Sequence, residues 1–150
     1  MTIQSQSEFM ANVLLEIYDE ANWLYKEKVP GDTGIFLELM KKNNIYLSIS
    51  KNIPTGFISY NVPDENVLII SGLYVSNAYQ KNGIASKLLN TVLNFFSKSI
   101  VYVDVLKTAA WAISFYKKHD FILVEDFESL PSAHKKFLEN NNWSTIMKRS

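Results

Sequence analysis

The feature that most constrains the fold is a strand–helix–strand pattern in the middle of the chain. Two apolar runs rich in β-branched residues, Val67–Val75 and Ile100–Leu106, flank an amphipathic stretch from Gly83 to Ser97. Strands joined by a helical crossover of this length pair in parallel, so we predict a βαβ unit here. The apolar positions of the expected helix are spaced at the helical period and comprise Ile84, Leu88, Val92 and Phe95, broadened by Leu89 and Phe96.

The residues before this unit predict two helices and a hairpin. One helix starts near Glu8, and a shorter one covers Thr33 to Lys42. Ile45–Ser50 and Gly56–Asn61 are predicted to be strands, because they combine apolar residues with flanking turn residues. The expected turns are Asn52–Thr55 and Val62–Asn66.

The residues after the unit predict a helix and two strands. The helix spans Ala109–His119, and the strands span Phe121–Phe127 and Trp143–Lys148, with a helical or irregular segment around Pro131 between them. Antiparallel hairpins combined with one crossover indicate an α+β fold, with helices and a mixed sheet in three layers. At 150 residues the chain has the length of a single domain, which we expect to span residues 1–150.

Composition excludes several classes of function. Fifteen Lys and Arg balance fifteen Asp and Glu, so the charge needed for nucleic-acid or anionic-membrane binding is lacking. The chain has no cysteine and two histidines, which argues against a disulfide framework or a metal site. The N-terminus is polar, and no apolar run is long enough to span a bilayer. We therefore expect a cytoplasmic protein that contains no metal.

A loop with anion-binding character follows the first strand of the βαβ unit. Lys81, Asn82 and Gly83 lie between that strand and the helix that begins near Gly83. Unpaired amides and the positive end of the helix dipole meet at such a helix start, and both favour a phosphate group. The loop matches neither the Walker pattern nor the dinucleotide-binding glycine pattern, and an ordinary turn has the same residues.

Two motifs together resemble the GNAT superfamily of acyl-CoA-dependent N-acetyltransferases. Gln-x-x-Gly-x-Ala at 80–85, after a strand ending Leu-Tyr-Val, resembles the family's pyrophosphate loop. Phe-Tyr-x-Lys at 115–118, followed by a strand that begins at Phe121, resembles its next motif. The resemblance extends from about Glu8 to Lys148. It implies a mostly antiparallel central sheet of about six to seven strands flanked by helices.

The resemblance also implies site residues. Acetyl-CoA would be the cosubstrate, with the main chain of Leu73, Tyr74 and Val75 pairing with its pantetheine arm. Tyr116 would be the general acid that protonates the departing thiolate. The acceptor would be an amine on a small molecule or a protein, and an exposed edge strand would allow a homodimer. The pyrophosphate would be held along the loop by Gln80, Lys81, Asn82, Gly83, Ile84, Ala85 and Ser86.

Three departures from the family pattern bear on the site. Ala109 stands where the family often has asparagine, and Asp120 stands where it usually has glycine. The strand segment that carries a glutamate base in some members is apolar here, Val67–Ile70. Glu65, Asp104 and Glu125 are candidates for the base, and Trp23, Asp104 and Glu125 for contacts with the acceptor.

Two other classes of function stay open from the sequence. One is a non-catalytic acyl-CoA-binding or regulatory module on the same fold. The other is an α/β protein that binds a phosphate ligand and has no relation to acetyl transfer.

Overall fold

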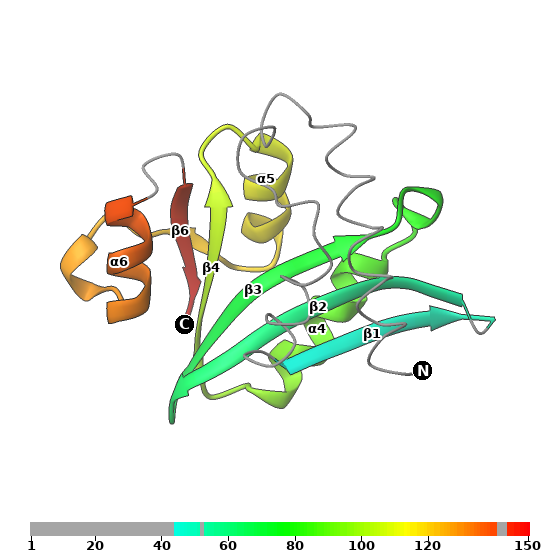
Figure 1. Cartoon of the computed structure of the whole chain (residues 1–150), viewed down its shortest axis with the longest axis horizontal. Helices are drawn as coiled ribbons and strands as arrows, with labels where there is room; N and C mark the ends of the chain where they lie inside the picture. Colours follow the sequence, from blue (N-terminus) through cyan, green and yellow to red (C-terminus); the bar gives the residue numbers. More distant parts are fainter. Residues whose placement is uncertain (1–43, 52, 141–143) are drawn as a thin grey trace. The chain divides into compact units, whose positions relative to one another are not determined.

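The computed structural model describes residues 44–51, 53–140 and 144–150 (Figure 1). The helices predicted from Glu8 and over Thr33–Lys42, together with Trp23, lie outside the described residues. Hydrogen bonding orders the described strands as β1-β2-β3-β4-β6-β5, in a mixed sheet. This confirms the predicted α+β class. The strands are β1 (Asn44–Ser50), β2 (Ile53–Asp64), β3 (Val67–Val75), β4 (Ile100–Leu106), β5 (Ile122–Leu123) and β6 (Ser144–Arg149).

Two compact units share these strands. The first consists of Met1–Asn61 and Ser71–Phe95, and the second of Val62–Ile70 and Phe96–Ser150. Strands β2 and β3 contribute residues to both units. A single domain over residues 1–150 stays a prediction.

In the first unit, β1 and β2 form an antiparallel hairpin whose turn is shorter than predicted. β2 begins at Ile53, so the expected turn over Asn52–Thr55 is wrong. Thr55 is fully buried and its Oγ1 donates hydrogen bonds to the carbonyl oxygen and Oγ of Ser48, at 3.2 and 2.9 Å. The register of the hairpin shifts between Ser48 and Ile49, so Thr55 is the extra residue of a β-bulge and these bonds tie it to β1. Lys51, with φ of 51°, reverses the chain instead.

Helix α4 (Ile84–Phe95) confirms the predicted crossover helix and packs against β1. One of its predicted core positions is wrong, because Phe95 is 77% exposed. The buried face is Leu88, Leu89, Val92 and Leu93. Phe95 lies roughly a quarter of a turn from the centre of that face, so the helix ends with this ring turned to solvent.

In the second unit, β4 confirms the parallel pairing expected of the βαβ unit. Val67–Ile70 of β3 pairs in parallel with Ile100–Val103 of β4. β2 extends to Asp64, so the turn is only Glu65 and Asn66 rather than Val62–Asn66. The Asp64 carboxylate accepts a hydrogen bond from the Glu65 amide at 2.8 Å, which stabilises this short turn.

The C-terminal part of the second unit contains an additional helix and a shorter strand than predicted. β5 covers only Ile122–Leu123 of the expected strand Phe121–Phe127. The chain then enters a 3₁₀ helix, η2 (Phe127–Ser129), because the Asp126 side chain caps it by accepting from the Glu128 amide. Helix α6 (Ser132–Asn140) follows and packs against β6. β6 pairs antiparallel with both β4 and β5.

Candidate functional site

The loop between β3 and α4 is held by its own side chains. It begins with a 3₁₀ helix, η1 (Asn77–Tyr79). Gln80 Nε2 donates to the Val75 carbonyl at 3.0 Å, and Asn82 Nδ2 lies 3.3 Å from the carbonyls of Tyr79 and Gln80. The amide side chains of Gln80 and Asn82 therefore shape the loop.

The backbone of this loop is left-handed at two positions directly before α4. Lys81 has φ of 65° and Gly83 has φ of 77°, a region that favours glycine. A Cβ added at Gly83 would meet nothing within 4 Å among the described residues. The Lys87 amide donates to the Gly83 carbonyl at 3.0 Å, so the helical hydrogen bonds begin at Gly83. The glycine is thus required by conformation, and open space lies beside the helix start.

The strand end before the loop carries the predicted pantetheine contacts. Leu73 and Tyr74 are half-buried, and Val75 is buried. A Cβ on Gly56 would lie 2.8 Å from the Tyr74 carbonyl oxygen, which is shorter than contacts between real Cβ and oxygen atoms. Gly56 is therefore needed for the close approach of β2 to this segment. The sequence analysis assigned it no role, because an isolated glycine in a strand indicates close backbone approach without saying to what.

In the second unit, Tyr116 lies on α5 (Ala110–Lys118) and is the buried residue of that helix, with 7% of its surface exposed. Its ring packs on Phe115 and Phe121, with centroid distances of 5.2 and 5.3 Å. Burial raises the pKa of Tyr116 above its usual range, and the Asp104 carboxylate raises it further. Tyr116 therefore remains a protonated phenol, which can donate a hydrogen bond or a proton.

Both departures from the family pattern on α5 have visible consequences. Ala109 is the N-cap residue, and no side chain caps this end of α5. At the other end Asp120 has φ of 69°, in the left-handed region that glycine usually occupies. Asp is among the few residues that tolerate this conformation, so the helix still ends at the expected place.

Asp104 of β4 contacts His134 of α6, which the sequence analysis did not select. Nε2 of His134 lies 3.2 Å from Oδ1 of Asp104. The Asp104 side chain is 28% exposed and the His134 side chain 4% exposed. Burial raises the pKa of Asp104 to about 7 and lowers the pKa of His134 to about 4. An isolated histidine carries no motif, so only the fold could show this pairing.

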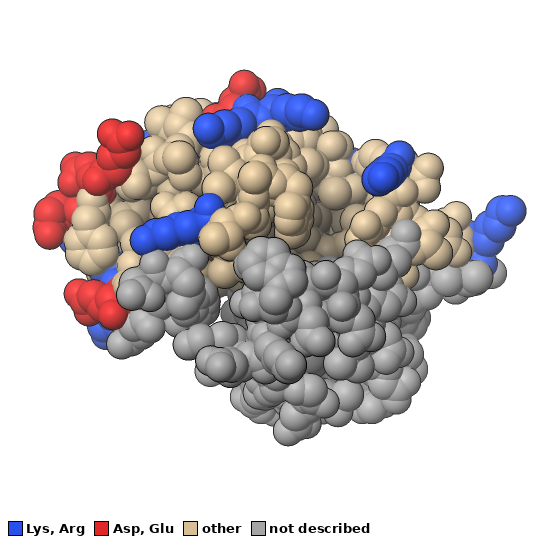
Figure 2. All heavy atoms as spheres, turned by 90° about the horizontal axis from the view of Figure 1, so that it is seen from above, with Lys and Arg blue, Asp and Glu red and all other residues tan. Residues whose placement is uncertain are grey.

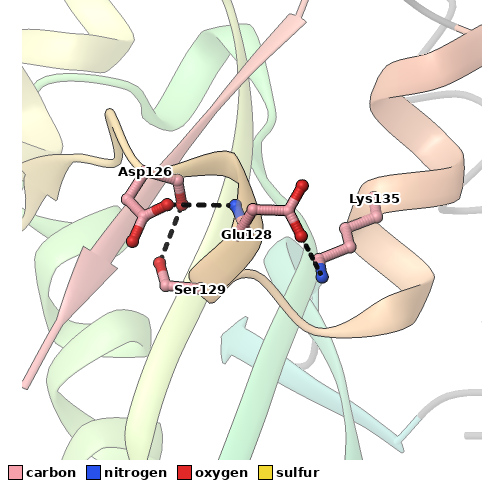
Figure 3. A network of polar contacts seen from close by, with 4 residues as sticks. All are labelled: Asp126, Glu128, Ser129 and Lys135. Atoms are coloured by element: carbon pink, nitrogen blue, oxygen red, sulfur yellow. Dashed lines mark hydrogen bonds and ion pairs between the residues drawn. The ribbon is translucent and has the colours of Figure 1, made fainter.

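The acidic segment around Glu125 has local structural roles (Figure 3). The carbonyl of Asp126 accepts from Ser129 Oγ at 2.8 Å, and Glu128 lies 3.5 Å from the Lys135 ammonium group. Glu125 is exposed. Figure 2 shows Asp and Glu side chains exposed on the surface, several of them close to one another.

Two classes of feature are lacking in the part of the chain that the structure describes. No group of three or more His, Asp or Glu side chains is arranged to hold a metal ion there. No helix among those same residues is long and apolar enough to cross a membrane.

Similarity to solved structures extends over the whole chain. An acetyltransferase of the GNAT family from Staphylococcus aureus Mu50 has a TM-score of 0.77 at 20% identity, covering 99% of this chain and 94% of that one. The PaiA N-acetyltransferase of Thermoplasma acidophilum, solved with coenzyme A, has a TM-score of 0.70 at 14% identity, covering 97% and 93%. At these identities the similarity establishes the fold.

A third structure adds a bound cosubstrate. The GNAT family acetyltransferase of Elizabethkingia anophelis, solved with acetyl-CoA, has a TM-score of 0.62 at 14% identity, covering 79% of this chain and 83% of that one. No curated relative matches the chain at significant sequence similarity. The sequence profile described as "Acetyltransferase (GNAT) family" matches residues 11–121. The chain therefore belongs to the GNAT acetyltransferase family.

Proposed function

We propose that this protein transfers the acetyl group of acetyl-CoA to an amine, by direct attack in a ternary complex. The observation that carries the proposal is the loop at Lys81–Gly83, where two of the three residues before α4 have a left-handed backbone. Such a loop directs backbone amides and the positive end of a helix toward one point, which favours a diphosphate. Relatives solved with coenzyme A or acetyl-CoA support this choice of ligand.

The residues proposed to hold acetyl-CoA act mainly through their backbone. The main chain of Leu73, Tyr74 and Val75 would pair with the pantetheine arm, as an added strand would. The Val75 carbonyl oxygen already accepts a hydrogen bond from Gln80. It can therefore accept fewer hydrogen bonds from the pantetheine arm than the carbonyl oxygens of Leu73 and Tyr74. The pyrophosphate would bind to the amides along residues 81–86, with the Lys81 ammonium group adding charge.

The reaction would form a C–N bond and break a C–S bond. The amine nitrogen attacks the thioester carbonyl carbon, and a backbone amide at the strand end stabilises the oxyanion that develops. The C–S bond then breaks, and the Tyr116 hydroxyl gives its proton to the departing sulfur. The raised pKa of Tyr116 opposes full transfer to a free thiolate. Burial of the sulfur beside Tyr116 would raise the pKa of the thiol as well, which would reduce the cost of the transfer.

The acceptor would be an amine on a small molecule or a protein. Asp104 and Glu125 are the described candidates for contacts with it, and Trp23 lies outside the described residues. Homodimer formation through an edge strand also stays a prediction. β5 is one such edge, and Ile122 on it is 60% exposed.

The decisive experiment combines binding and turnover. Acetyl-CoA is titrated into the protein by calorimetry, and free thiol release is then followed with a panel of small amines, polyamines and peptides with free amino termini. The proposal predicts saturable binding and release of one thiol for each amine acetylated. Binding without turnover on any amine would instead identify a non-catalytic acyl-CoA-binding module, and absence of binding would contradict both.

A further inference from the structure

The second unit contains a carboxyl–imidazole pair, Asp104 and His134, whose imidazole has no role in the proposed function. His134 is 3% exposed and approaches Asp104 with its Nε2, 3.2 Å from Oδ1. Among the described residues, Oδ1 of Asp104 and both ring nitrogens of His134 lack a hydrogen bond of good geometry. Buried polar atoms are nearly always paired, so this cluster is unusual enough to need an explanation.

The fold holds both members of the pair in place. Tyr102 and Asp104 are two residues apart on β4 and therefore project from the same face of the strand. The ring of His134 packs edge-on against Tyr102, with centroids 5.7 Å apart and an interplanar angle of 76°. The amide of His134 donates to the Pro131 carbonyl at 3.0 Å, and the neighbouring Leu130 is buried in the core formed with Tyr102. The imidazole therefore has little freedom to turn away from the carboxyl group.

The position of Asp104 along β4 makes its carboxyl group reachable. The pairing of β4 with β3 ends at Val103, and Asp104 is the next residue. Its side chain keeps 28% of its surface exposed, whereas that of His134 keeps 4%. One side of the carboxyl group is thus closed by His134, while the side chain can still be reached from outside.

The ionisable groups around Asp104 come from three elements. α5 contributes Tyr116, whose pKa is raised by burial and by Asp104 itself. α6 contributes His134, and β6 places Lys148 two residues from Ile146, the direct partner of Asp104. The paired segment of β3 is apolar. The same three elements also carry Lys117 and Lys118 on α5, Lys135, Lys136 and Glu139 on α6, and Arg149 on β6.

We propose that Asp104 is the base that takes the proton from the acceptor amine, and that His134 is a positioning residue for its carboxylate. The assignment rests on the proposed acetyl transfer. As the C–N bond forms, an N–H bond of the attacking nitrogen breaks and its proton moves to Asp104. The C–S bond breaks, and Tyr116 protonates the sulfur. Solvent afterwards removes the proton from Asp104 and returns one to Tyr116.

The electrostatics of the pair suit this role. A carboxyl group with a pKa of about 7 is a far better proton acceptor than an ordinary aspartate, and it is still ionised in a large fraction near neutral pH. His134, with a pKa of about 4, stays neutral there. In the tautomer with its proton on Nε2, the positive end of that N–H group lies close to Oδ1, with the two heavy atoms 3.2 Å apart, and a small adjustment of the ring would align it as a donor that favours the ionised carboxylate.

The test measures kcat/KM against pH for an amine that the wild-type protein acetylates, with the acetyl-CoA dissociation constant measured for every variant. We expect the wild-type profile to fall on the acid side with an apparent pKa near 7. Asp104→Asn should lower kcat/KM by about 100-fold or more and remove that fall, while acetyl-CoA affinity stays unchanged. Asp104→Glu should restore part of the activity. The matched control is Glu139→Gln, which neutralises an exposed carboxylate of α6 and should keep the wild-type profile.

His134 is tested through the same profile. His134→Phe keeps a ring but removes the donor, so the acid limb should move to higher pH by about one unit or more. If His134 had only a structural role, the variant would lose activity, but the apparent pKa on the acid side of its kcat/KM profile would stay the same. Should Asp104→Asn fail to fold, Asp104→Glu and His134→Phe still test the assignment through the position of the limb.

Two failures can be told apart. Wild-type protein that binds acetyl-CoA but acetylates no amine contradicts the proposed function, and this assignment with it. Turnover by wild type, with an Asp104→Asn variant equally active or weakened only through lost acetyl-CoA affinity, overturns the assignment alone.

Discussion

The amide of Phe121 donates to the carbonyl of Tyr116 at 3.1 Å, across the C-terminal end of α5. The Asp120 amide donates to the Lys117 carbonyl, also at 3.1 Å, and Asp120 itself is left-handed. These two bonds form a Schellman motif, and the packing of the Tyr116 and Phe121 rings supplies the apolar contact that accompanies it. The end of the helix thereby fixes the position of the tyrosine on which the proposed chemistry depends.

Replacing Asp120 tests this helix end. Asp120→Gly should raise the free energy of unfolding by about 0.5–1 kcal/mol, because glycine adopts a positive φ without steric cost. Asp120→Val should lower it by about 1 kcal/mol or more, and Asp120→Asn should change it little. Urea denaturation of the three variants measures this, and equal stability for Gly and Val would show that the left-handed conformation is not retained.

Removing the Tyr116 hydroxyl tests the proposed general acid. Tyr116→Phe should reduce kcat by about 100-fold or more, with acetyl-CoA affinity and stability little changed, because the ring still packs on Phe115 and Phe121. Steady-state kinetics and calorimetry provide the two readouts. The matched control is Tyr46→Phe on β1, an exposed tyrosine that should keep wild-type rates. Unchanged kcat in the Tyr116 variant would remove it from the mechanism.

Adding a side chain at Gly83 tests the anion-binding loop. Gly83→Asn suits the left-handed backbone and its Cβ meets nothing within 4 Å, so the free protein should be almost as stable as wild type. The new side chain would occupy the space assigned to the diphosphate and should weaken coenzyme A binding by about tenfold or more. Gly83→Val adds backbone strain to the same effect. Full coenzyme A affinity in a folded Gly83→Asn protein would place the ligand elsewhere.

The pair of Asp104 and His134 predicts opposite pH dependences of stability in two variants. The folded-state pKa of Asp104 is raised to about 7, so its contribution to stability is present below about pH 4 and is lost as pH rises through 7. The folded-state pKa of His134 is lowered to about 4, so its contribution is present above about pH 6.5 and is lost as pH falls through 4. In the wild-type protein the two groups therefore change the free energy of unfolding in opposite directions as pH rises from about 4 to 6.5.

Replacing one residue of the pair leaves only the pH dependence of stability that the other residue causes. Asp104→Asn should become more stable as pH rises from about 4 to 6.5, and His134→Phe should become less stable as pH rises from about 4 to 7, by on the order of 1–3 kcal/mol. Melting temperatures at closely spaced pH values measure both. If both variants follow the wild-type curve, neither group has the pKa assigned to it.

The acidic residues Glu125, Asp126 and Glu128 can act through their charge, and Asp126 also acts by capping η2, so different variants separate the two effects. Neutralising Glu125, Asp126 and Glu128 together should raise KM for a cationic acceptor, because it removes three negative charges around Glu125, a proposed contact of the acceptor. Asp126→Ala alone should cost about 1 kcal/mol of stability, because its side chain caps η2, whereas Asp126→Ser should retain most of the cap. An unaltered KM in the triple variant would leave these residues with structural roles alone.

Strong periodicity made the centre of the fold predictable from the sequence. β4 and the parallel pairing around it follow from β-branched runs separated by a helical stretch, and they are confirmed. The ends of elements were less predictable, because side-chain contacts made only in the folded protein decide them. Thr55 lies at a β-bulge of β2 and is bonded to Ser48. The strand predicted to reach Phe127 ends at Leu123, and Asp126 caps η2 instead.

Some residues of the candidate site could also be predicted from the sequence, and others could not. Gly83 and Tyr116 belong to motifs with fixed spacing, so the sequence alone could propose them as site residues. Asp104 appeared there as one of three candidates for the base, and His134 had no role, because their contact joins β4 to a helix thirty residues later in the chain. Gly56 was missed for a similar reason, since the need for a glycine appears only when β2 approaches Tyr74.

A crystal structure of the protein with coenzyme A tests the central claim most directly. The account predicts the diphosphate at the backbone amides of residues 81–86, beside the left-handed Gly83, and the sulfur within hydrogen-bonding distance of the Tyr116 hydroxyl. Coenzyme A bound on another surface of the protein, with this loop empty, would contradict it.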